Sequence, residues 1–259
     1  MTLCNLTTTA RWQNSGMANG LRVLLLHGLG ATGAVWSGWE PILERHWPGR
    51  WAAPDLPGHG GSPELPGYTF DALAEAVRPL VDPGGGTVVL GHSLGGVVAL
   101  ALAAKVPLAG VAGLGIKVDW TGEELGRARA LAGRPVTWFD SEDEAITRYL
   151  RVSGLAGLIE PGHPAARDGV REQDGRWRLA LDPRAFGVGA PDMAALVAGS
   201  PSPLLLARGE NDPMNTDDQI KALGVRVSTL PGLGHNAHVE SPERCAELLR
   251  QPEFGPSLR

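Results

Sequence analysis

The sequence predicts an α/β protein in which a mostly parallel central sheet carries helices on both faces. Short apolar runs alternate with amphipathic segments along the chain, which is typical of strands and helices that follow one another in such a fold. The runs are apolar throughout and lack a period of two, as strands buried on both faces do. A chain of 259 residues, 43% of them hydrophobic, is long enough for one such unit with an insertion.

The predicted strands are the apolar runs that end in glycine, proline or polar residues. They lie at 21–28, 50–58, 86–93, 108–118, 202–212 and 225–235. The stretch "TLCNLTTTARW" at 2–12 is expected to add one or two antiparallel edge strands.

The predicted helices lie between these runs, at 34–46, 69–81, 94–105, 217–223 and 241–250. The last helix has a clear start. Ser241 can accept a hydrogen bond from the first turn, and Pro242 occupies the first helical position, where its missing N–H costs little.

Residues 119–200 interrupt the alternation of strands and helices. They contain no strong strand pattern and many charges, and they are too many for a structureless loop in a compact protein. We therefore expect a mainly helical lid at 119–200, inserted into a core made of residues 1–118 and 201–259.

Composition excludes several classes of partner. The net charge of −5 comes without any stripe of lysine and arginine, so nucleic acid is not expected to bind. No leader-like segment and no run of about 20 apolar residues is present, which predicts a cytoplasmic protein without a membrane span. Cys4 and Cys245 lie near opposite ends of the chain and are predicted to be free thiols.

The stretch GHSLG at 91–95 places a serine between a buried strand and a helix and fits the pattern G-x-S-x-G. A sharp turn there would push the Ser93 hydroxyl out at the carboxyl end of the strand. Gly91 and Gly95 would avoid a collision of side chains within the turn, and Gly96 would let the helix approach the sheet. The alternative is that Ser93 only caps the helix.

A serine hydroxyl becomes a strong nucleophile only when an oriented base takes its proton. Asp212 and His235 follow Ser93 in chain order, each at the carboxyl end of a predicted strand, which is the order associated with this strand–turn–helix arrangement. Two alternatives remain open: His238 could replace His235 as the base, and Asp119 could replace Asp212 as the acid.

Four segments resemble those of the α/β-hydrolase family and occur in the same order: "LLLHGLGATGAVW", "APDLPGHGGS", "GENDPM" and "PGLGHNAHVESPE", beside the serine turn. The resemblance covers nearly the whole chain. It implies that Ser93 is the nucleophile, that His235 is the base and that Asp212 orients it. It also implies an oxyanion hole formed by the main-chain N–H groups of Leu29 and Leu94.

The resulting hypothesis is a serine hydrolase, a carboxylesterase that cleaves small or medium, largely uncharged esters or lactones through an acyl-serine intermediate. No metal or cofactor is expected, because the histidines and carboxylates lack metal-ligand spacing and the triad needs no ion. Residues expected to line the substrate pocket are His92, Trp36, Trp120 and Trp138.

Three other functions are compatible with the same fold. The first is hydrolysis of carbon–carbon bonds in ring-fission products, in which a lid arginine would hold a substrate carboxylate. The candidates are Arg127, Arg129, Arg148 and Arg151. The others are a cofactor-free perhydrolase or haloperoxidase, and a ligand-binding receptor that keeps the fold. The sequence does not predict an oligomeric state.

Overall fold

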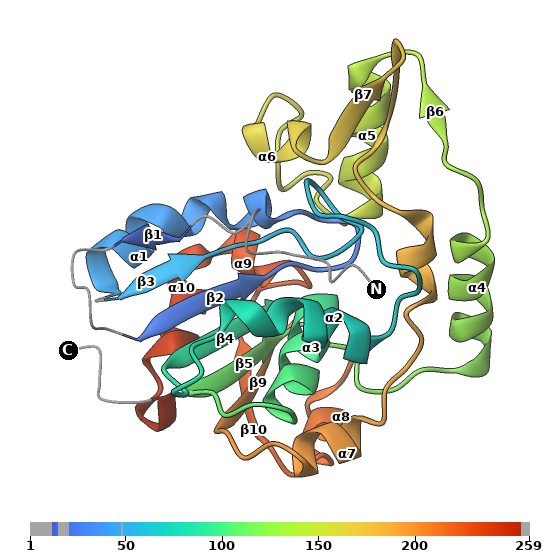
Figure 1. The fold of residues 1–259 in the computed structure, drawn as a ribbon. Helices are drawn as coiled ribbons and strands as arrows, with labels where there is room; N and C mark the ends of the chain where they lie inside the picture. Colours follow the sequence, from blue (N-terminus) through green and yellow to red (C-terminus); the bar gives the residue numbers. More distant parts are fainter. Residues whose placement is uncertain (1–11, 15–20, 48, 255–259) are drawn as a thin grey trace.

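The computed structural model describes residues 12–14, 21–47 and 49–254. Within these residues the central sheet consists of β1 (Gln13–Asn14), β2 (Arg22–Leu26), β3 (Arg50–Ala52), β4 (Thr87–His92), β5 (Gly110–Leu114), β9 (Leu204–Gly209) and β10 (Arg226–Leu230). Their order is β1-β3-β2-β4-β5-β9-β10 (Figure 1). β1 is antiparallel to β3, and all other neighbours are parallel. The predicted mostly parallel sheet is therefore confirmed.

All six predicted strands are present, and each is shorter than its apolar run. β3 ends at Ala52 although the run continues to residue 58, because residues 53–56 leave the sheet and the chain turns at Pro57 and Gly58. The Asp55 carboxylate accepts hydrogen bonds from the main-chain N–H groups of Gly33 and Gly61, both at 2.7 Å. The predicted edge strands at 2–12, and Cys4 with them, lie outside the described residues except for Trp12.

The helices of the core flank the sheet. They are the α-helices α1 (Glu40–His46), α2 (Phe70–Val77), α3 (Leu94–Ala103), α8 (Asp217–Lys221), α9 (Ala237–Glu240) and α10 (Pro242–Ala246), and the 3-10 helices η2 (Gly33–Trp39), η3 (Arg78–Leu80), η5 (Glu247–Arg250) and η6 (Pro252–Phe254). Each of the five predicted helices is present. Two of the predicted helices end in 3-10 helix: α2 continues as η3, and α10 continues as η5.

Ser241 does not act as the predicted side-chain cap. It stands directly before α10, with Pro242 in the first helical position, but its side chain makes no capping hydrogen bond. Ser241 also ends α9, so the chain passes from one helix to the next without a loop. The Ser241 ψ of 79° differs from the extended conformation that normally aims a capping side chain at the helix N–H groups.

Alternate residues of each inner strand face two separate cores. Val23 and Leu25 of β2 pack in one buried cluster with side chains of η2, α1 and α10. Leu24 and Leu26 pack in the other with side chains of α2 and α3. Full burial of a leucine stabilises the fold by about 1.5–3 kcal/mol, so both faces of a strand favour apolar residues. This explains why the strand sequences show no period of two.

Residues 119–200 contain α4 (Gly122–Ala132), β6 (Trp138–Phe139), α5 (Glu142–Val152), α6 (Pro164–Arg167), β7 (Val170–Gln173), β8 (Arg176–Leu179), η4 (Pro183–Gly187) and α7 (Met193–Ala198). β6, β8 and β7 form a small antiparallel sheet that the sequence did not predict. These strands are two to four residues long and rich in polar side chains, so no apolar run marks them.

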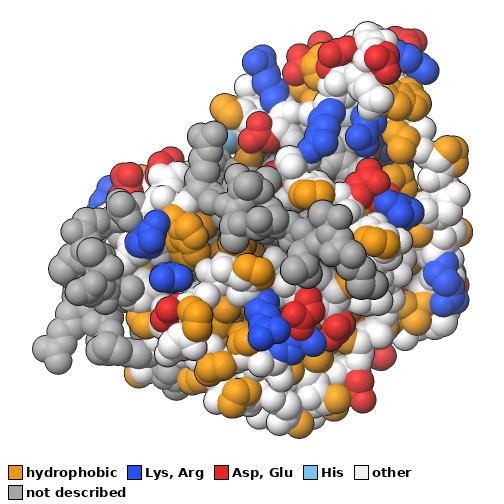
Figure 2. All heavy atoms as spheres, in the orientation of Figure 1, with side chains coloured by type: hydrophobic (Ala, Val, Ile, Leu, Met, Phe, Trp, Pro, Cys, Tyr) orange, Lys and Arg blue, Asp and Glu red, His pale blue; other side chains and the backbone are white. Residues whose placement is uncertain are grey.

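The segment 119–200 lies beside the core at the loops that follow β2 and β10 (Figure 1). Asn236, after β10, donates a side-chain hydrogen bond of 2.9 Å to the carbonyl oxygen of Gly154, after α5. On the face in Figure 2, basic and acidic side chains are interspersed. No helix in the described ranges is long and apolar enough to cross a membrane.

Gly95, in the first turn of α3, lies against the backbone at the end of β2. A Cβ at this position would be 2.4 Å from the carbonyl oxygen of Leu26 and 2.6 Å from that of His27. We expect Gly95→Ala to lower the free energy of unfolding by about 2–3 kcal/mol or more, because backbone must move to admit the methyl group. Urea denaturation measures this effect.

Gly126, in α4, is the matched control. A Cβ there meets no atom within 4 Å. Alanine should therefore raise the free energy of unfolding by about 0.5–1 kcal/mol, through its better helix propensity. Equal urea midpoints for the two variants would contradict the packing argument.

Candidate active site

Ser93 is the single residue between β4 and α3, and its backbone is strained. Its φ of 49° lies in the left-handed region, which costs a residue other than glycine about 1–3 kcal/mol. The main-chain N–H of Ser93 donates to the carbonyl oxygen of Leu114 on the neighbouring β5, at 2.9 Å. The Ser93 side chain makes no capping hydrogen bond. The structure thus gives no support to the alternative that Ser93 only caps α3.

Asp212 and His235, from the loops after β9 and β10, are paired. Nδ1 of His235 lies 3.1 Å and 3.2 Å from the two carboxylate oxygens of Asp212. The Asp212 carboxylate also accepts a hydrogen bond of 2.9 Å from the main-chain N–H of Met214. Burial raises the pKa of Asp212, but the hydrogen bond and charge of His235, with the N–H of Met214, outweigh burial and lower that pKa below its usual value. The carboxylate is therefore held in its charged form beside the imidazole.

His92, the residue before Ser93, connects the serine turn to the His235 loop. Nε2 of His92 donates to the main-chain carbonyl oxygen of His235 at 2.9 Å, and the two ring centroids are 4.7 Å apart. Among the described residues, no hydrogen bond joins the Ser93 hydroxyl to His235. Such bonds are often long when no substrate is bound. The contacts of His92 nevertheless bring Ser93 and His235 to the same edge of the sheet.

Two main-chain N–H groups next to Ser93 are available for a ligand. Leu94 is the first residue of α3, and Leu29 lies in the loop after β2. Neither N–H has an acceptor in the part of the chain that the structure describes. The two loops are in close contact, because a Cβ on Gly28 would lie 3.4 Å from Cβ of Ser93. An oxyanion hole requires two such donors aimed at one point, and Leu29 and Leu94 stay the candidates for it.

His27 supports the loop that carries Leu29. Its Nδ1 donates to the carbonyl oxygen of Gly28, and its Nε2 accepts from the main-chain N–H of Leu56, both at 2.8 Å. Burial lowers the pKa of His27, which favours the neutral form that can donate and accept at once. His27 is therefore a structural brace of the loop.

The structure separates the two pairs of alternatives. Asp119 is exposed and does not contact His235, whereas Asp212 does. His238 is buried against the rings of His92 and Trp36, at centroid distances of 4.1 Å and 4.6 Å. Neither ring nitrogen of His238 has a partner within the described residues, and burial lowers its pKa to about 3. The acid and the histidine that form a hydrogen bond are therefore Asp212 and His235, not Asp119 and His238.

The residues expected to line the substrate pocket lie in different surroundings. His92 is buried beneath the serine turn. Trp36 is 0% exposed and packs edge-to-face on Trp39, at a centroid distance of 5.0 Å. Trp120 packs against the buried cluster of α2 and α3, and Trp138 is half-buried in β6. Trp36 is thus a core residue in this structure, and the pocket roles of the other three stay predictions.

The close approach of Gly28 and Gly115 to the site was not recognised in the sequence. Gly115 has a φ of 61°, and a Cβ there would be 3.1–3.3 Å from atoms of His235 and Asp212. The only sequence signal is that each glycine lies within the last four residues of a predicted strand. Within the described residues, no group of three potential metal ligands occurs.

Four buried histidines are expected to make the free energy of unfolding depend on pH. Burial lowers the pKa values of His27, His59, His92 and His238 from 6.5, to about 3 for His59 and His238. Below pH 6.5 the unfolded chain binds protons that the folded protein does not, so the free energy of unfolding should fall as pH falls towards 3. Each histidine contributes up to about 1.4 kcal/mol per pH unit.

Urea midpoints measured between about pH 7.5 and pH 5 test this dependence. His238→Phe removes one buried imidazole and should make the pH dependence shallower. His46 is exposed, so in His46→Gln the urea midpoint should depend on pH as it does in the wild type. A wild-type stability that does not change over this range would contradict the prediction.

Comparisons with known proteins agree with this fold. The model of the alpha/beta hydrolase family matches residues 23–248. Lipase LipV of Mycobacterium tuberculosis is 35% identical over 261 residues, which cover 94% of this chain and 97% of that protein. A pimeloyl-[acyl-carrier protein] methyl ester esterase of Sodalis glossinidius is 40% identical over 175 residues, which cover 64% of this chain and 60% of that protein.

The solved structure of E-2-(acetamidomethylene)succinate hydrolase is similar in fold. Its TM-score is 0.73 at 21% identity, and the match covers 93% of this chain and 97% of that one. At this identity the likeness concerns the fold alone.

Proposed function

Because this chain belongs to the alpha/beta hydrolase family, we propose that it is a serine hydrolase that cleaves carboxylic esters through an acyl intermediate on Ser93. The observation that carries the proposal is the pair of buried Asp212 and half-buried His235, at the same edge of the sheet as a sharply turned serine and two N–H groups that have no acceptor among the described residues. The relatives named as a lipase and a methyl ester esterase support an ester as the substrate.

In the first half of the reaction, His235 takes the proton of the Ser93 hydroxyl while the serine oxygen attacks the carbonyl carbon. The hydrogen bond from Nδ1 to Asp212 leaves Nε2 of His235 as the acceptor. The N–H groups of Leu29 and Leu94 then donate to the oxyanion, and one such donor contributes about 3 kcal/mol in comparable sites. His235 returns the proton to the leaving alcohol.

In the second half, water replaces the alcohol and the same groups act again. His235 takes a proton from water, the hydroxide attacks the acyl carbon, and Ser93 is released with its proton restored. Asp212 stays charged throughout and stabilises the imidazolium that forms twice in each cycle.

The surroundings of the serine support the proposed substrate class. The side chains of Leu29 and Leu94 belong to an apolar cluster, which favours an uncharged ester or lactone at the serine. We propose a substrate of small or medium size. We propose that residues 119–200 act as a lid over this substrate, because α5 contacts the loop of Leu29. A Cβ on Gly30 would lie 3.1 Å from Cγ1 of Val152.

A side-by-side assay tests the proposal. The wild-type protein should hydrolyse p-nitrophenyl esters and react with a fluorophosphonate probe at Ser93, as peptide mass spectrometry would show. The label should disappear in His235→Ala. Absence of both turnover and label would contradict a serine hydrolase. Faster turnover of a vinylogous diketone acid than of any ester would instead support carbon–carbon bond hydrolysis.

A further inference from the structure

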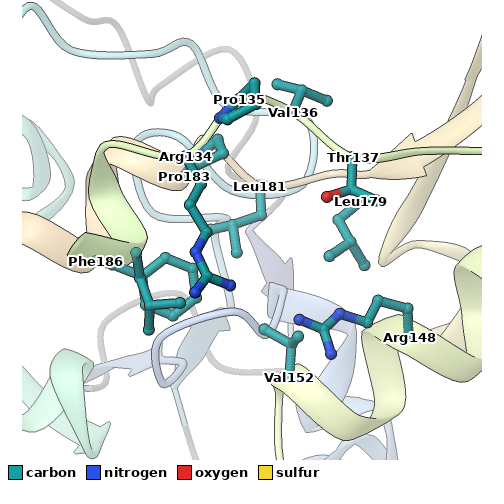
Figure 3. Close-up of a pocket in the computed structure, with 11 residues that line it drawn as sticks. Arg134, Pro135, Val136, Thr137, Arg148, Val152, Leu179, Leu181, Pro183 and Phe186 are labelled. Atoms are coloured by element: carbon teal, nitrogen blue, oxygen red, sulfur yellow. The ribbon is translucent and has the colours of Figure 1, made fainter. Parts of the chain in front are cut away.

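A pocket in the segment 119–200 has apolar walls and two arginines. It lies between the loop after α4, the helix α5 and the stretch from β8 to η4 (Figure 3). Leu179, Leu181 and Phe186 form part of its apolar wall. Arg134, from the loop after α4, and Arg148, from α5, extend their guanidinium groups into the pocket from opposite sides.

Both arginines lack a partner. Neither Arg134 nor Arg148 makes a hydrogen bond or an ion pair within the described residues, and no Asp or Glu is among the described residues that line the pocket. Other arginines nearby are paired: Arg127 lies 2.6 Å from Glu123, and Arg184 lies 2.7 Å from Asp182.

Two unpaired positive charges that face one pocket repel each other, although Arg134 and Arg148 are both exposed and solvent screens that repulsion. An anion between them would turn the repulsion into attraction. Arginine is suited to this role, since its planar guanidinium can donate two parallel hydrogen bonds to one carboxylate or phosphate. The pocket therefore combines a surface for a hydrocarbon chain with a site for an anion.

The pocket adjoins the candidate oxyanion loop. Val152 forms part of its wall and also packs on Gly30, the residue after Leu29. The side chains of Leu29 and Leu94 belong to the same large apolar cluster as Leu181 of the pocket wall.

We propose that this pocket binds the anionic end of the substrate, a carboxylate or phosphate borne on the part of the ester remote from the scissile bond. The inference rests on the proposed function and narrows it: the reacting ester is uncharged, but the molecule carries one negative charge at its far end. Water adds across the ester bond of such a monoester, giving a carboxylate, an alcohol and one proton, with no other reactant.

Monomethyl adipate and dimethyl adipate provide matched substrates, because they differ only in the charge at one end. The measured quantity is the ratio of their kcat/KM values. In Arg134→Gln/Arg148→Gln this ratio should fall about tenfold, mainly through the KM of the monoester. Arg134→Lys/Arg148→Lys should keep part of the preference, because it keeps the charges and loses the paired geometry.

Arg151→Gln is the control. Arg151 is exposed on α5 close to Arg148 but does not line the pocket, so the ratio should stay within about twofold of wild type. An unchanged ratio in Arg134→Gln/Arg148→Gln would overturn the proposal, as would an equal fall in Arg151→Gln. Inhibition of monomethyl adipate hydrolysis by methyl phosphate more strongly than by acetate would identify phosphate as the preferred anion, and the reverse would identify carboxylate.

Binding keeps this inference separate from the catalytic proposal. Calorimetry with adipate and Ser93→Ala should show binding that Arg134→Gln/Arg148→Gln weakens about tenfold in the same background. If the wild type hydrolyses neither ester and takes no fluorophosphonate label, but adipate binds in this way, the proposed reaction is wrong and the anion site stands. If esters are hydrolysed but adipate binding is unaffected by the arginines, the anion site is wrong.

Discussion

Replacing Ser93 with alanine is expected to lower kcat for ester hydrolysis by about 10⁴-fold or more, because the variant has no oxygen to form the acyl intermediate. Its fold should be retained. The Ser93 hydroxyl makes no hydrogen bond with the described residues, and alanine has the same cost as serine in the left-handed conformation. Steady-state kinetics with p-nitrophenyl butyrate, together with urea denaturation, measures both effects.

Ser37→Ala is the control for this experiment. Ser37 is exposed in η2, so the variant should keep wild-type kinetics. Near-wild-type turnover by Ser93→Ala would rule out Ser93 as the nucleophile. A large loss of stability in Ser93→Ala would mean that the hydroxyl has a structural role, which the absence of contacts argues against.

Asp212→Asn is expected to lower kcat by about 10³–10⁴-fold. An asparagine amide can donate to Nδ1 of His235, which would leave the proton on Nε2 and remove the acceptor for the Ser93 hydroxyl. The amide oxygen can still accept the N–H of Met214, so the turn should keep its shape. The measurement is kcat between about pH 5 and pH 9. This range distinguishes a shift of the pH profile from a fall of kcat at every pH.

Asp119→Asn tests the alternative acid in the same assay. Asp119 is exposed and does not touch His235, so its kcat should stay within about twofold of wild type. The opposite result, a large loss in Asp119→Asn and a small one in Asp212→Asn, would assign the acid to the end of the preceding strand of the sheet and would contradict the geometry.

The sheet was predictable because its strands are local and strongly patterned. The continuous apolar run of β4 and the glycines of the turn at 91–95 are signals that neighbours in the chain supply. The small sheet of β6, β7 and β8 had no such signal. In β7, "VREQ" is almost wholly polar, and its pairing with β8 depends on a hairpin turn at Asp174 and Gly175, both with positive φ.

The choice of site residues was only partly predictable. Chain order pointed to Ser93, Asp212 and His235, because each lies at the carboxyl end of a predicted strand. His238 stands only three residues after His235. What separates them is that the helix α9 turns His238 inwards, onto the rings of Trp36 and His92.

By itself, the sequence determined the α/β class, the position of the serine turn and the order of the candidate triad, since each depends on residues that are close together in the chain. Tertiary structure alone decided that Asp212 and not Asp119 meets His235, and that Arg134 and Arg148 share one apolar pocket. The physical reason is the same in both cases. Such contacts form only when segments far apart in the chain pack together, and no local pattern of residues records which segments will meet.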